Sequence, residues 1–198
     1  MTSFAPAPPA KVSSIYIYEE WTRADVFLID STKLVDLSIK IDLKTNVIDI
    51  QYKNIVKILP FSKVLALVLK TGTGDNEEYI NGSFLFGSQS VYKDQLFRVE
   101  YKGKVNLFCK IQATIIESSN DSQNPMLNLP KDENRVELKK KYIIVRGEDI
   151  VEVEGSKSKF RDDLTHVFGA DAEPLVKKTN LKDENDLIVL VKGLASLN

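Results

Sequence analysis

Residues 104–115, with the sequence KVNLFCKIQATI, contain the longest regular alternation of apolar and polar side chains in the chain. The odd-numbered positions are apolar, namely Val105, Leu107, Cys109, Ile111, Ala113 and Ile115. Side chains two residues apart point to the same face of a β-strand. The pattern therefore predicts a strand with one buried face, joined to a strand over 97–101 by a tight turn at Lys102-Gly103.

The same period of two extends toward the N-terminus. The alternation predicts a meander of short strands with polar turns, over 35–43, 48–52 and 55–59. Residues 64–69 are apolar on both faces, which predicts a strand in the middle of the sheet or beneath a helix. Weaker strand patterns lie at 15–18 and 26–29, and a later hairpin joins 142–145 to 150–153 through Gly147.

After Ser156 the apolar period changes from two to 3.6, which indicates helices. The first predicted helix begins at Ser156 or Ser158 and ends at Gly169, a short one covers 172–178, and Asp183 caps the last. Apolar stripes mark the first and last helices, at Phe160, Leu164, Val167 and Phe168 and at Leu187, Leu190, Val191 and Leu194.

The fold class expected is therefore mainly β or α+β, an antiparallel meander sheet with a small C-terminal subdomain of two or three short helices. Residues 1–12 are expected to form a flexible Pro- and Ala-rich lead-in. Residues 13–155 are expected to form the β domain, with long loops at 71–90 and 118–134, and residues 156–198 the helical subdomain packed on it.

Composition excludes several classes of function. The 198 residues include 27 basic and 28 acidic side chains, so no excess of positive charge favours nucleic acid. The single Cys excludes an intrachain disulfide and a four-cysteine zinc site. The longest apolar run, 64–69, is far shorter than the roughly 20 residues of a membrane-spanning helix. Residues 1–10 lack the features of an intact signal peptide.

Catalytic chemistry has few candidates. His166 is the only histidine and follows Asp162 by one helical turn, but no nucleophile motif accompanies it. Cys109 lies on an apolar strand face, where a buried thiol is expected. We therefore predict no catalytic residues and no enzyme.

Cofactor and metal sites are also not predicted. The Gly-containing stretch 71–74 lacks the Lys-Ser/Thr pair of a phosphate-binding loop. Next to it, Asp75, Asn76, Glu77 and Glu78 supply oxygen ligands suited to calcium, but their spacing is not that of an EF-hand.

The organisation resembles a loosely defined family of uncharacterised exported proteins of Bacteroidota. The resemblance rests on the segment 95–107, the tyrosine-containing hairpin 141–148 and the terminal helical stretch 158–188, after a long polar loop. It implies a periplasmic or cell-envelope location and no established activity. The alternative location is the cytoplasm.

Two functional hypotheses follow. The first is a non-enzymatic envelope protein that binds another protein, as a subunit of a membrane-associated complex, with Met126, Leu127 and Leu129 as candidate partner contacts. The second is a small-ligand or glycan-binding β-domain that uses aromatic side chains such as Tyr16, Tyr18, Trp21 and Tyr92. A hydrolase with paired carboxylates ranks third. An exposed aliphatic patch would favour the first hypothesis, and a cluster of exposed Tyr and Trp the second.

Overall fold

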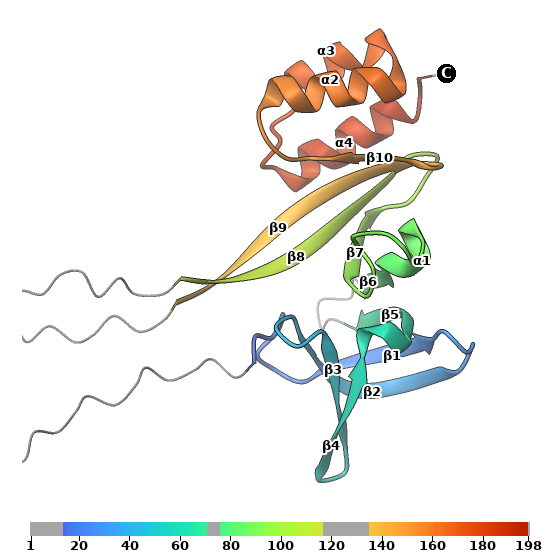
Figure 1. Ribbon diagram of the computed structural model, residues 1–198, viewed down its shortest axis with the longest axis vertical. Helices are drawn as coiled ribbons and strands as arrows, with labels where there is room; N and C mark the ends of the chain where they lie inside the picture. Colours follow the sequence, from blue (N-terminus) through green and yellow to red (C-terminus); the bar gives the residue numbers. More distant parts are fainter. Residues whose placement is uncertain (1–13, 71–75, 117–134, 198) are drawn as a thin grey trace, which may run out of the picture.

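A computed structural model describes residues 14–70, 76–116 and 135–197 of the chain. The described strands form one antiparallel ten-stranded sheet in the order β10-β9-β8-β7-β6-β5-β1-β2-β3-β4, which confirms the mainly β fold class (Figure 1). The strands are β1 (Thr22–Leu28), β2 (Lys33–Asp42), β3 (Val47–Tyr52), β4 (Ile55–Pro60), β5 (Val64–Lys70), β6 (Asn76–Asn81), β7 (Leu96–Tyr101), β8 (Asn106–Ile116), β9 (Arg135–Arg146) and β10 (Asp149–Glu152).

The C-terminal helices pack on one face of the β8–β10 end of the sheet, as Figure 1 shows. They are α2 (Lys157–Phe168), the 3₁₀ turn η2 (Ala170–Ala172), α3 (Glu173–Lys178) and α4 (Glu184–Leu194). Ser156 and Asp183 cap α2 and α4 as predicted, each accepting a backbone N–H three residues on. The apolar stripes of these two helices cover the predicted apolar face of β8, around Leu107 and Cys109.

Two further clusters fill the rest of the molecule. The first lies over β1, β2, β3 and β5 and includes Phe61 of the 3₁₀ turn η1 (Phe61–Lys63). Strand β5 lies between β6 and β1, which confirms the central position predicted for residues 64–69. The second cluster contains Phe97, Phe108 and Ile143, beside the short helix α1 (Gly82–Phe86). Because Phe108 alternates with Leu107 and Cys109, this cluster lies on the sheet face opposite the C-terminal helices.

The prediction of a long loop over 71–90 is wrong for residues 76–86, which form β6 and α1. β6 shows no apolar alternation because Glu77 and Glu78 form ion pairs with Arg98 and Lys102, and its backbone pairs with β5 and β7. Asn81 ends the strand and caps α1 by accepting the Ser83 N–H at 2.8 Å.

The two weaker strand predictions differ in outcome. Residues 26–28 belong to β1, whereas residues 15–18 contribute only an isolated bridge between Tyr16 and Asp42. Asp42 is nevertheless buried there, and it accepts the Ile15 N–H at 3.0 Å and the Thr45 hydroxyl at 2.8 Å. The Asp42 carboxylate thus connects the segment before β1 to the β2–β3 turn through hydrogen bonds.

Candidate functional site

The partner contacts predicted from the sequence, Met126, Leu127 and Leu129, lie outside the described residues, as does the polar loop 118–134 that contains them. The described ranges nevertheless include a second apolar surface, which we define as the β4 edge: residues 52–60, that is, the last residue of β3, the turn and β4.

The β4 edge exposes aliphatic side chains on both faces of the sheet. Ile58 is 68% exposed, Ile55 62% and Val56 52%. These fractions are large because β4 is the last strand in the order and projects with β3 beyond the body of the molecule (Figure 1). Contiguous apolar exposure of this kind is typical of an interaction surface.

The backbone of β4 is also open along one side. The two-residue turn at 53–54 pairs Tyr52 with Ile55. In such a hairpin the Ile55 N–H points to β3, and backbone groups then alternate between the two sides of the strand. Val56 and Ile58 therefore direct their N–H and C=O groups away from β3. These groups can pair with one additional strand.

The charges of the β4 edge are positive. Lys53 and Lys57 are its only ionisable side chains apart from the Tyr52 phenol, and both ammonium groups lie over the Tyr52 ring, at 5.6 and 4.9 Å from its centroid. Pro60 closes the strand at a position where the missing N–H would have faced the open side. The edge is thus short, cationic and limited by proline, features that prevent indiscriminate pairing of sheet edges.

A second notable cluster is a buried ion-pair network centred on Arg98 of β7. Its guanidinium donates to Glu100 at 2.6 Å, to Glu184 of α4 at 3.0 Å and to Glu77 of β6 at 3.3 Å. The Arg98 side chain is 13% exposed and that of Glu100 8%. Burial raises the pKa of Glu100, although Arg98 opposes this shift.

Tyrosine hydroxyls donate hydrogen bonds to two carboxylates of the network, those of Glu184 and Glu77. The Tyr142 hydroxyl donates to Glu184 at 2.9 Å, and the Tyr18 hydroxyl to Glu77 at 2.7 Å. Burial and then the Glu77 hydrogen bond raise the pKa of Tyr18 to about 12. Each of the three carboxylates accepts a hydrogen bond from Arg98. We interpret the network as a set of hydrogen bonds and ion pairs that hold α4 and the segment before β1 on the sheet.

The structure separates the residues considered for catalysis. Cys109 is fully buried beneath the helices, where burial raises the pKa of its thiol to about 12. His166 lies exposed on α2, and the Asp162 carboxylate one turn earlier pairs with Arg161. The cysteine and the histidine thus lie in different layers of the fold.

The candidate calcium ligands are also divided. Asp75 lies outside the described residues, and Glu77 and Glu78 project to opposite faces of β6. Glu77 belongs to the Arg98 network, whereas Glu78 pairs with Lys102 at 2.7 Å. Within the described ranges no group of three or more His, Cys, Asp or Glu side chains is arranged to hold a metal ion.

The four aromatic residues proposed for a ligand site do not form one cluster. Tyr16 and Trp21 share the ammonium of Lys40, which lies 4.9 and 5.4 Å from their ring centroids. Tyr18 joins the Arg98 network, and Tyr92 packs on Phe86 on the far side of the sheet. Sequence patterns gave no means of separating these roles.

None of the helices in the described part of the chain has the length and apolar character needed to cross a membrane. Comparison of the chain with protein-family models, curated proteins and solved structures gave no significant match.

Proposed function

We propose that this chain is a non-enzymatic protein-binding module whose β4 edge accepts an extended segment of a partner protein as an additional strand. The observation that supports this function is the exposure of Ile55, Val56 and Ile58 on a strand whose outer backbone groups are unpaired within the described chain. Strand addition uses those two features together, because main-chain hydrogen bonds supply affinity and side-chain pockets supply specificity.

The charge of the edge indicates the character of the partner segment. Lys53 and Lys57 favour acidic side chains, and the exposed aliphatic residues favour apolar ones. A second copy of the same hairpin would bring like charges together. The partner segment is therefore a strand in which apolar and acidic residues alternate, on another protein rather than on a second copy.

The cell-envelope location belongs to the same proposal. Its support is the resemblance of the sequence to exported proteins of Bacteroidota, which makes the partner another envelope protein and the chain a subunit of a membrane-associated complex.

Selection of short random peptides against the immobilised chain tests the binding mode. We expect the enriched peptides to alternate apolar and acidic residues, and to lose about tenfold or more in affinity toward Ile58→Pro, which removes an outward N–H. Ile58→Glu, which keeps the N–H but repels the acidic side chains of the peptide and removes apolar contact, should also bind weakly. A matched control is Val189→Thr, since Val189 is also 68% exposed but lies on α4.

The proposal is overturned if no peptide is enriched, or if the selected peptides bind both Ile58 variants as tightly as the parent. Urea unfolding of each variant shows whether the hairpin still folds, because the Ile58 N–H does not pair with β3 and the parent stability should be retained.

A further inference from the structure

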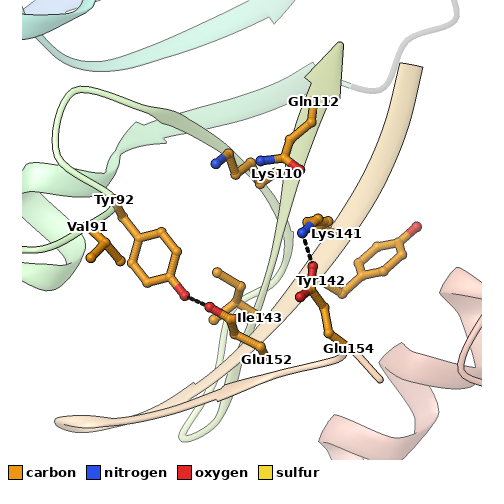
Figure 2. A pocket seen from close by; sticks show the side chains of 9 residues that line it. All are labelled: Val91, Tyr92, Lys110, Gln112, Lys141, Tyr142, Ile143, Glu152 and Glu154. Carbon is orange, nitrogen blue, oxygen red and sulfur yellow. Dashed lines mark hydrogen bonds and ion pairs between the residues drawn. The ribbon is translucent and has the colours of Figure 1, made fainter. Parts of the chain in front are cut away.

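A small hollow lies on the sheet face opposite the C-terminal helices, bounded by β8, β9 and β10 and by the segment between α1 and β7 (Figure 2). Its volume is about 250 Å³. Since one water occupies roughly 30 Å³ in the liquid, the hollow has room for about eight waters or one small organic molecule. The lining residues are Val91, Tyr92, Lys110, Gln112, Lys141, Tyr142, Ile143, Glu152 and Glu154.

Two lysines lie side by side on the floor of the hollow. Lys110 of β8 and Lys141 of β9 are direct cross-strand partners, an arrangement that destabilises a sheet unless each charge is compensated. Lys141 forms an ion pair with Glu154, as Figure 2 shows. Lys110 has no carboxylate within ion-pair distance among the described residues. Burial, followed by the charge of Lys141, lowers the pKa of Lys110.

A carboxylate in the same hollow is also without a cation. Glu152 of β10 accepts a hydrogen bond from the Tyr92 hydroxyl, and no lysine or arginine of the described chain lies within ion-pair distance of it. The hollow therefore presents one unpaired ammonium and one unpaired carboxylate, too far apart to pair with each other. Val91, from the segment between α1 and β7, and Ile143 of β9 also line the hollow.

We propose that this hollow binds a small zwitterion, an amino acid with an aliphatic side chain. Its carboxylate would pair with Lys110 and accept from the Gln112 amide, its ammonium would pair with Glu152, and its side chain would contact Val91 and Ile143. A ligand with both charges compensates both unpaired groups, whereas a simple anion or cation compensates one and leaves the other. This site is separate from the β4 edge and does not depend on the function proposed for it.

Isothermal titration of the whole chain with L-leucine, 4-methylpentanoate and 3-methylbutylamine tests the inference, because the two analogues lack the ammonium and the carboxylate respectively. We expect leucine to bind at least about tenfold more tightly than either analogue, the effect of losing one charged hydrogen-bonded contact. Lys110→Met should weaken leucine and abolish its advantage over the amine. Glu152→Gln should abolish its advantage over the acid.

Lys104→Met is the matched control, since Lys104 is an exposed lysine that precedes β8 and does not line the hollow. It should bind leucine as the parent does. Ile58→Pro should do so as well, which separates this site from the β4 edge. Lys110→Gln serves as the second variant if Lys110→Met does not fold. The inference is overturned if leucine does not bind, if either analogue binds as tightly as leucine, or if the folded Lys110 variant retains leucine affinity.

Discussion

Strands β8 and β4 contain the same kinds of branched apolar residue, but they lie in opposite environments. β8 has a neighbour on each side and the helices α2–α4 above it, so that Leu107 and Cys109 are fully buried. β4 has one neighbour and lies at the far end of the molecule from those helices, so that Ile55 and Ile58 are more than half exposed (Figure 1). Strand order, not strand composition, therefore decides which apolar residues stabilise the fold and which are available to a partner.

The largest expected effect concerns the helix-covered end. Phe160 of α2 is fully buried in the core cluster that the helices share with β8, and its replacement in Phe160→Ala leaves a cavity that costs about 3–5 kcal/mol of unfolding free energy. The exposed Val189→Ala on α4 should change it by less than about 0.5 kcal/mol. Urea unfolding followed by circular dichroism measures both. Equal midpoints for the two variants would show that the helices do not complete the core of β8.

The next effect is a difference in unfolding free energy between substitutions in β3 and β4, the two strands of one hairpin. Ile48 of β3 is fully buried, whereas Ile58 of β4 is 68% exposed. Ile48→Ala should cost about 2–5 kcal/mol, and Ile58→Ala less than about 0.5 kcal/mol. The same urea experiment distinguishes them. If Ile58→Ala destabilised the chain as much as Ile48→Ala, the β4 edge would be part of the core and not a free surface.

The environments of β8 and β4 could be predicted from the sequence to different degrees. The alternation at 105–115 predicts a strand with one buried face, and the stripe from Phe160 to Phe168 predicts an amphipathic helix, because burial on one face imposes a period on the sequence. The pattern at 55–59 predicts a strand but not its edge position, which depends on the pairing of all ten strands. The Arg98 network joins β6, β7 and α4, and its hydrogen bond from Arg98 to Glu184 links residues 86 positions apart, so no local pattern marks it.

A smaller effect concerns Asp42, which stabilises the end of the sheet that the helices α2–α4 do not cover. Asp42 is buried, and although burial works to raise its pKa, hydrogen bonds from Ile15, Thr45 and Lys44 hold that pKa below its ordinary value. A carboxyl group with a lowered folded-state pKa stabilises the fold above its unfolded pKa of about 4, and this contribution is lost as the pH falls through the folded value.

Asp42→Asn should therefore cost about 1–2 kcal/mol at pH 7, because hydrogen bonds to a charged acceptor are replaced by weaker ones. The difference in unfolding free energy between parent and variant should shrink as the pH falls below about 4. Urea titrations at a series of pH values measure it. A difference that stayed constant with pH would show that the Asp42 charge does not hold the segment before β1.

The smallest effect lies at the tip of the β4 edge. Lys53 has a φ of 55°, in the left-handed region that an L-residue enters at a cost and glycine enters freely. Lys53→Gly should raise the unfolding free energy by up to about 1 kcal/mol, while Ile55, Val56 and Ile58 stay exposed.

Lys53→Gly also removes one of the two cations of the edge, so the acidic peptides selected against the parent should bind more weakly and with a shallower dependence on salt. Lys57→Gln, which removes the other cation from an extended backbone position, should weaken the peptides without the gain in stability. If Lys53→Gly raised stability but left peptide affinity and its salt dependence unchanged, the edge would recognise its partner through apolar and backbone contacts alone, and the alternating acidic residues would no longer be part of the proposal.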